Sequence, residues 1–169
     1  MILHHKQRLN DISFYIKSPL HYSNSFTFIP IYYKYKGKII NVVFQTPQLF
    51  VPYGIKELSN KKLILDLSFQ NHENDIHVSN FVEDLEIIYM RFFKKYTDLY
   101  QVHHFLRETI FYKCMRCKVD SSTLLFNQSK QQINTIHPFT YSRFLLQLSG
   151  LWIIDNEVWF QWNILQGQT

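Results

Sequence analysis

The residues with the clearest chemistry are lysines that lie close to aromatic residues. Tyr32 and Lys34 share one side of a predicted strand, and Lys36 and Lys38 flank the glycine of the turn that follows. Lysine ammonium groups can neutralise phosphates, and aromatic rings offer flat faces on which unpaired bases stack. This combination favours a surface that binds a polyanion with exposed bases.

Other residues of the same two types are further candidates for nucleic-acid contact. They are Tyr53, Lys61, Lys62, Tyr141, Arg143, Trp152 and Trp159. For each of them a structural role is the alternative, because most rings pack in a core and most lysines are simply solvated. Trp162 falls on the apolar side of the last predicted strand and is assigned to the core, whereas Trp159 falls on the other side.

Catalytic motifs are missing from the sequence. It contains no Gly-rich phosphate loop, no GxSxG, no HExxH and no pair of carboxylates in a context suited to acid–base work. The eight histidines are scattered along the chain. We therefore expect a protein without enzymatic activity and without a cofactor.

The two cysteines form one CxxC motif, Cys114 to Cys117. Two thiolates at this spacing can share a zinc ion, for which His103 or His104 would supply further ligands. A second CxxC pair is missing, so two reduced thiols without a metal are the favoured interpretation. The zinc module stays open as an alternative.

Length and composition indicate one globular domain over residues 1–169. Hydrophobic residues make up 46% of the chain, charged residues 18% and aromatic residues 17%, which is more ring surface than a core of this size needs. The formal net charge is +5, and residues 1–66 hold nine Lys/Arg against three Asp/Glu. A basic N-terminal half favours a polyanionic partner.

The sequence gives no sign of membrane insertion. No apolar run approaches the roughly 20 residues of a membrane span, and the N-terminal MILHHKQRLN lacks the apolar core of a signal peptide. We expect a soluble protein in the cytoplasm.

The hydrophobic periodicity predicts mostly strands. Alternation of apolar and polar residues predicts strands at residues 26–35, 39–44, 62–69, 109–118, 141–154 and 158–164, with a bulge at Gly150. One helix is predicted at residues 81–100, capped by Ser79 or Asn80, and residues 70–80 and 121–138 are predicted loops. This order favours a mainly β fold, a five- to six-stranded β-barrel of the oligonucleotide-binding (OB) type with one inserted helix.

The stretch QTPQLFVPYG interrupts this pattern with two prolines. Pro47 should end the strand before it, and Pro52 with Gly54 should shape a turn. The polar side chains of Gln45 and Thr46 can bond either the backbone or a base edge, and the rigid connection can hold Phe50 or Tyr53 at a groove or under the barrel.

Several of these stretches together resemble a known family. FQTPQLFVPYGI, KKLILDLSF, the helix FVEDLEIIYMRFF and the closing FLLQLSGLWIIDNEVWFQWNILQ resemble the virus-type single-stranded-DNA-binding proteins of nucleocytoplasmic large DNA viruses, which look like distant relatives of podophage counterparts. The resemblance runs from about Asp11 to Gln166. The composition, rich in Asn, Lys, Ile, Phe and Tyr, is also similar to that of proteins of yeast cytoplasmic linear plasmids.

The resemblance implies a non-catalytic OB-fold protein that coats single-stranded DNA while a viral or plasmid genome replicates in the host cytoplasm. Replication proteins of the same element are the implied partners, and a homo-oligomer is compatible with this role. A β-barrel that binds proteins, as a virion or transcription-complex subunit, remains the alternative, because exposed aromatic residues suit a protein interface equally well.

Overall fold

The computed structural model describes residues 3–4, 13–70, 72–110 and 112–169. Asp11, where the family resemblance begins, and most of the first ten residues lie outside this part. The described elements are β1 (Leu3–His4), β2 (Phe14–Ile16), β3 (Leu20–Ser23), β4 (Phe26–Tyr35), β5 (Lys38–Gln45), β6 (Leu49–Val51), β7 (Ile55–Glu57), β8 (Leu63–Ser68), α1 (Ile76–Tyr96), β9 (Gln101–Val102), β10 (Leu106–Glu108), β11 (Lys113–Val119), β12 (Leu124–Phe126), β13 (Gln132–Ile133), β14 (Thr140–Ile154) and β15 (Glu157–Gln168).

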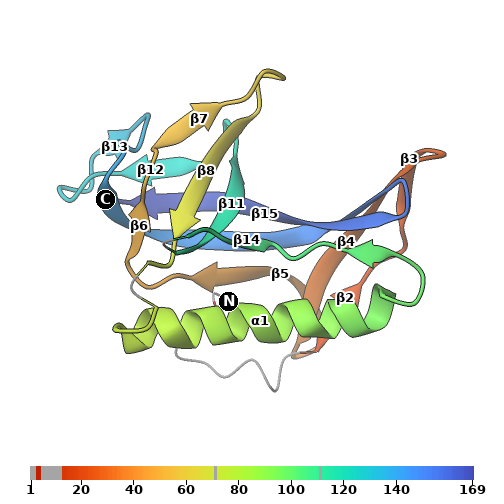
Figure 1. Cartoon of the computed structure of the whole chain (residues 1–169). Coiled ribbons are helices and arrows are strands. Elements are labelled where there is room, and N and C mark those ends of the chain that lie inside the picture. The colour runs from red at the N-terminus through yellow and green to blue at the C-terminus, as the bar shows by residue number, and fades with distance from the viewer. Residues whose placement is uncertain (1–2, 5–12, 71, 111) are drawn as a thin grey trace.

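Five strands close a barrel in the order β14, β6, β8, β11, β15 and back to β14. Strand β14 pairs with β15 along almost its whole length, and its other edge pairs in turn with β6, β5 and β4. The barrel closes through the parallel bridge between Lys118 of β11 and Asn163 of β15. The predicted OB-like barrel with one inserted helix is confirmed (Figure 1).

The long strands keep one side inward along their full length. On β14 Leu146, Leu148 and Leu151 are buried, and Trp162 on β15 is 2% exposed. The pairing register of β14 with β15 shifts between Leu145 and Leu146 and again between Leu148 and Gly150. After each shift the alternation of inward and outward side chains continues. The second shift confirms the bulge predicted at Gly150, and the opposite side of both strands therefore stays outward.

Helix α1 lies along the barrel and closes its core (Figure 1). It buries seven side chains in the hydrophobic core: Val78, Phe81, Val82, Leu85, Ile88, Phe92 and Tyr96. The Asp75 carboxylate caps it by accepting hydrogen bonds from the backbone N–H groups of His77 and Val78, at 2.8 and 3.3 Å. No helix among the described residues is both long and apolar enough to cross a membrane.

The predicted helix start was wrong by five residues. Ser79 and Asn80 lie inside the first turns, because Asp75, within the predicted loop, provides the cap instead. The predicted end at Tyr100 is also late, since the helix stops at Tyr96 and continues as a hydrogen-bonded turn.

The predictions of long strands are more accurate than those of short strands. The predicted strands at 26–35, 39–44, 62–69, 141–154 and 158–164 are confirmed as β4, β5, β8, β14 and β15. The strand predicted at 109–118 begins at Lys113, and the loop predicted at 121–138 contains β12 and β13. These two short strands are held by pairing to β15 and to each other rather than by any apolar alternation of their own.

Thr46 fastens the end of β5 to β14. Its hydroxyl donates to the carbonyl of Pro47 at 2.7 Å and accepts from the backbone N–H of Phe144 at 2.9 Å. The side chain is 1% exposed. Of the two roles left open for Thr46, the structure shows the bond to the backbone.

Gly54 and Gly37 allow a paired test of the turn after β6. Both have positive φ, +66° and +76°, but a Cβ on Gly54 would lie 2.6 Å from the Ile136 carbonyl oxygen, whereas a Cβ on Gly37 meets nothing within 4 Å. We expect Gly37→Ala to cost about 1–2 kcal/mol, the usual penalty of left-handed backbone. Gly54→Ala should cost clearly more, as measured by urea unfolding. Equal losses would show that the turn shifts freely away from Ile136.

Candidate nucleic-acid interface

The outward side of β14 carries aromatic, amide and basic side chains in one line. Its residues are Tyr141, Arg143, Leu145, Gln147, Gly150 and Trp152. Their register partners on neighbouring strands are Phe50, Val43, Gln45, Pro30, Phe28, Trp159, Gln161, Asn163, Gln166 and Gln168. We call this set the outer track. None of these residues is acidic, and one carboxylate, that of Glu157, lies at the far end beside Trp159. The end that holds Tyr141 and Arg143 therefore suits phosphates better than the far end.

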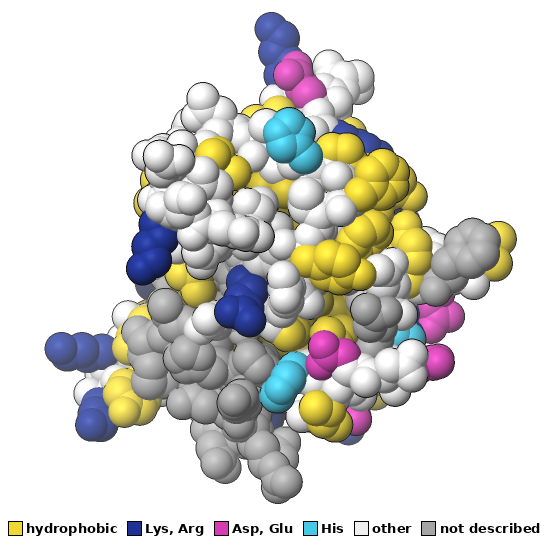
Figure 2. Space-filling model, turned by 90° about the vertical axis from the view of Figure 1, so that its left-hand side faces the viewer, with side chains coloured by type: hydrophobic (Ala, Val, Ile, Leu, Met, Phe, Trp, Pro, Cys, Tyr) yellow, Lys and Arg dark blue, Asp and Glu magenta, His cyan; other side chains and the backbone are white. Residues whose placement is uncertain are grey.

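One end of the outer track is an exposed group of rings, here called the end patch. It consists of Phe50, Phe139 and Tyr141. The Phe50 ring lies 5.2 Å from Tyr141 and 6.5 Å from Phe139, measured between centroids. Figure 2, which views the side of the molecule bearing β6, β12 and β13, shows hydrophobic side chains gathered on this surface. Sequence reasoning had named Tyr141 as a contact, and the structure places its ring beside that of Phe50.

Phe139 is the most exposed ring of the end patch and was missed by sequence reasoning. Its side chain is 75% exposed, and its backbone has a φ of +60°. A left-handed conformation costs a residue with a Cβ about 1–2 kcal/mol. The backbone N–H donates to the Val51 carbonyl at 2.8 Å and holds the residue in place. The fold thus fixes a large ring in water at a conformational cost, which is a pattern typical of functional sites.

Three hollows surround Tyr141 and Arg143, with volumes of about 110, 180 and 570 Å³. Amide side chains recur in their walls: Gln45, Gln48, Gln70, Asn127, Gln128, Gln166 and Gln168. The Gln70 amide donates to the Tyr141 hydroxyl at 3.0 Å. An amide both donates and accepts, so it can bond the edge of any base. Arg143 lines the 180 Å³ hollow. Its guanidinium group can bind a phosphate through two parallel hydrogen bonds.

Tyr53, another predicted contact, forms a hydrogen-bonded pair with Tyr112. Their hydroxyl oxygens lie 3.2 Å apart, and the Lys56 ammonium lies 3.7 Å from the centre of the Tyr53 ring. The hydrogen bond to Tyr53, together with burial, raises the pKa of Tyr112 to about 12. Tyr112 therefore stays neutral near pH 7, and Lys56 adds positive charge beside Tyr53.

A second group of rings and lysines, here called the hairpin patch, lies on the outward side of β2 and β4. It consists of Tyr15, Lys17, Tyr32 and Lys34. Tyr15 and Tyr32 are register partners; the Lys17 ammonium lies 5.1 Å from the Tyr32 ring centre, and the Lys34 ammonium 5.2 Å from that of Tyr15.

The lysines of the hairpin patch do not prevent stacking. An exposed cation–π contact is worth about 0.5–1 kcal/mol, whereas a stacked base is worth about 1–3 kcal/mol. A base can therefore displace either ammonium group, which then lies close to the phosphates of the same strand. Tyr15 and Lys17 were missed by sequence reasoning because the three residues of β2 show no readable alternation.

The predicted lysines belong to two separate hairpins. Lys36 lies in the two-residue turn between β4 and β5, and Lys38 begins β5. Lys61 and Lys62 lie in the turn between β7 and β8, which projects at the top of Figure 1, whereas β2 and β5 lie near α1 at the bottom. The structure does not bring the four lysines into one row.

The two candidate tryptophans are register partners at the far end of the outer track. Trp152 packs against Phe28 at 4.8 Å and Tyr22 at 5.5 Å, and its N–H donates to Gln161. Trp159 lies parallel to His103 at 3.8 Å, and its N–H donates to Glu157. One face of Trp159 is thus already covered, and a carboxylate lies beside it.

The CxxC motif does not form a shared metal site. On β11 Cys117 points inward and is fully buried, whereas Cys114 lies on the opposite side of the strand. Burial raises the pKa of both thiols. His104 instead bonds Glu86 at 2.8 Å, and the described residues contain no group of three or more His, Cys, Asp or Glu that can hold a metal ion. The geometry therefore contradicts the zinc alternative.

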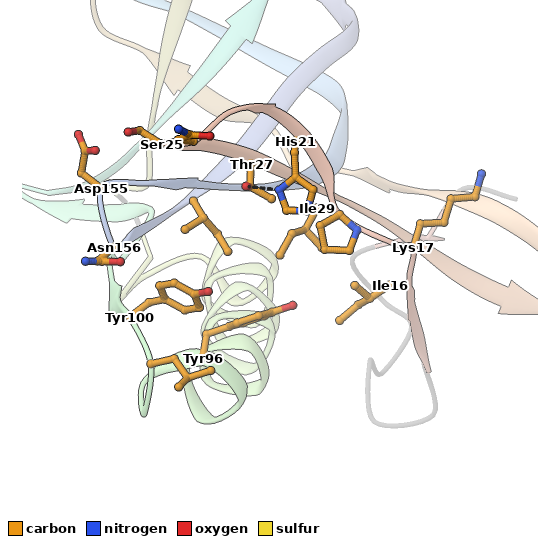
Figure 3. A pocket seen from close by; sticks show the side chains of 14 residues that line it. Ile16, Lys17, His21, Ser25, Thr27, Ile29, Tyr96, Tyr100, Asp155 and Asn156 are labelled. Atoms are coloured by element: carbon orange, nitrogen blue, oxygen red, sulfur yellow. Dashed lines mark hydrogen bonds between the residues drawn. The ribbon is translucent and has the colours of Figure 1, made fainter.

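A further hollow, of about 580 Å³, lies elsewhere (Figure 3). Tyr96 at the end of α1 and Tyr100 in the turn after it form one wall, and Ile29 belongs to the inward side of β4. His21 bonds Thr27 at 3.0 Å on its rim. None of the residues that sequence reasoning assigned to nucleic-acid contact lines it.

Among the comparisons with known proteins, the one with solved structures shows which fold this chain shares. No protein-family model and no curated protein sequence matches this chain. Among solved structures, the single-stranded-DNA-binding protein from bacteriophage Enc34 is similar, with a TM-score of 0.53 and 10% sequence identity over 92% of this chain and 89% of that one. The same phage protein in complex with single-stranded DNA gives a TM-score of 0.50 and 9% identity over 89% of this chain and 93% of that one. The chain thus shares its whole fold, an OB-like barrel with one helix, with a phage single-stranded-DNA-binding protein.

Proposed function

We propose that this protein binds single-stranded DNA on the outer track, with the end patch as its principal contact. It has no catalytic activity in this role. The observation that carries the proposal is a line of rings and amides with Arg143 near one end, on a fold shared with a DNA-binding phage protein.

Binding proceeds through two kinds of contact. Arg143 and nearby lysines attract the phosphates, and bases then stack on the rings of the end patch while amides bond their edges. Amides and rings accept every base, so sequence preference is low. The protein coats and protects unpaired DNA during replication of a viral or plasmid genome in the host cytoplasm, a role supported by the family resemblance.

Titration of a labelled oligothymidine with purified protein tests this function. Fluorescence anisotropy should show binding that weakens with salt, with a log–log slope of about −0.7 for each phosphate neutralised, and a matching duplex should bind far more weakly. Absence of binding to the single strand at low salt would overturn the proposal. Oligouridine in the same series distinguishes DNA from RNA.

A protein interface is the second candidate function, favoured by the 75% exposed ring of Phe139. The end patch would then bind a virion or transcription-complex subunit, replication protein or second copy of this chain. In that case DNA binding is weak and insensitive to salt, and a size-exclusion column shows a stable complex or oligomer.

A further inference from the structure

We propose that the hairpin patch is a second contact for the same DNA strand that the end patch binds. The DNA strand then runs from the end patch along β14 and across β5 to the hairpin patch, with rings at both ends and neutral side chains between them. This inference rests on the proposed function and specifies how that site is built.

The register of the sheet connects the two patches. Trp152, at the far end of β14, is the partner of Phe28 on β4. From Phe28 the outward side of β4 continues through Pro30 to Tyr32, whose neighbour on β2 is Tyr15. The rings therefore continue from β14 onto β4 and β2 on one side of the sheet.

The surface between the two patches suits weak binding of the DNA strand. Its side chains are neutral: Gln147 on β14, with its partners Val43 and Asn163 on the two flanking strands. Gly150 lies farther along, where the Phe28 ring covers it. Amides can bond bases there without fixing their identity, and strong contacts are confined to the two ends.

The distance between the patches sets a length requirement. Tyr32 is the partner of Asn41, which adjoins Val42, the partner of Leu148 on β14. Seven residues separate Tyr141 from Leu148, which at the rise of a β-strand is roughly 23 Å, and the hairpin patch lies beyond, across β5. A very short oligonucleotide can occupy the end patch alone, whereas one near the upper limit of about 16 nucleotides for an OB fold can reach both. Loss of the hairpin patch should therefore weaken only the longer strands.

The test is a length series of oligothymidines of 4, 8, 12 and 16 nucleotides at low salt. The wild type is compared with the double variant Tyr15→Leu/Tyr32→Leu, in which leucine keeps apolar contact with the sheet but removes the stacking faces. We expect the 16-mer to bind the variant at least about 5-fold more weakly, the lower limit for one lost stack. The 4-mer should bind equally well to both proteins.

Tyr35→Leu is the matched control, because Tyr35 lies on the same hairpin but alternation places it on the opposite side of β4 from Tyr32. It should leave all lengths unchanged. Lys17→Ala/Lys34→Ala, which alters only exposed side chains, provides a second variant that is safe for folding. It should flatten the salt slope of the 16-mer by about 1.4, the value for two phosphate contacts.

The two proposals fail in different ways. Equal loss for the 4-mer and the 16-mer, or no loss for either in folded variants, would overturn the hairpin contact while DNA binding itself stands. Wild-type protein that binds no oligomer of any length would overturn the proposed function and the hairpin contact together.

Discussion

Replacing Phe139 and Tyr141 together with alanine should lower the affinity for oligothymidine by about 30-fold or more. Each stacked base contributes about 1–3 kcal/mol, and 1.4 kcal/mol corresponds to a factor of ten. Both rings are exposed, 75% and 45%, so the loss should appear in binding rather than in folding. Anisotropy titration at one salt concentration measures it, and thermal unfolding checks the fold.

Two comparisons make this expectation specific. Phe139→Gly removes the ring and also suits the positive φ at that position, so it should weaken binding without destabilising the protein. Ile110→Ala removes another highly exposed apolar side chain, 94% exposed, and should change nothing. Unaltered DNA affinity in the Phe139→Ala/Tyr141→Ala variant would exclude the end patch as a stacking surface.

Charge at the same site can be separated from stacking. Arg143→Ala should flatten the salt slope by about 0.7, the contribution of one phosphate. Lys94→Ala removes the same charge from the exposed side of α1 and should leave the slope unchanged. If both variants flatten it alike, attraction is spread over the whole basic surface rather than directed to the outer track.

Long strands were predictable from the sequence because each carries its own signal. In β4, Ile29, Ile31 and Tyr33 are buried while Tyr32 and Lys34 on the other side are not, and this alternation is readable without a structure. The fold class followed from five such strands and one long helix. Thr46 shows the limit of this reading, because its bond to Phe144 joins residues 98 positions apart.

Short strands form because they pair with neighbouring strands, and the sequence does not show which strands will be neighbours. Strand β2 has three residues and β13 has two, too few to show a period, and both are held by register with a neighbour. Only half of the hairpin patch could therefore be predicted, because Tyr32 and Lys34 lie on a long strand, whereas Tyr15 and Lys17 do not.

The candidate site depends on backbone geometry as well as on residue type. Phe139 lies between the loop predicted at residues 121–138 and the strand predicted from Tyr141, and nothing in the local sequence reveals its left-handed conformation or its hydrogen bond to Val51. Tyr141 and Arg143 were predictable, since their alternation on one strand places both side chains on the same side. Lys36 and Lys38 are separated from Lys61 and Lys62 because the two pairs lie on different hairpins. Charge clustering in the sequence does not reveal how those hairpins are arranged.

Trp162 and Trp159 lie three residues apart on β15 and should differ strongly in their effect on stability. Trp162 is 2% exposed and packs against Phe44 and Phe105 at 5.9 and 5.3 Å, whereas Trp159 is 39% exposed on the outward side. Trp162→Ala should lower the free energy of unfolding by about 3–5 kcal/mol. Trp159→Ala should lower it by less than about 1 kcal/mol, the range of most exposed positions. Urea unfolding measures both.

A third variant separates packing from hydrogen bonding in the core. The indole N–H of Trp162 is buried and has no hydrogen-bond acceptor among the described residues, so it contributes a desolvation cost rather than a bond. Trp162→Phe removes that donor while keeping most of the ring surface, and its cost should fall well below that of alanine. If Trp159→Ala instead destabilised the protein as much as Trp162→Ala, the assignment of inward and outward sides on β15 would be wrong. The outer track, which depends on that assignment, would then have to be redrawn.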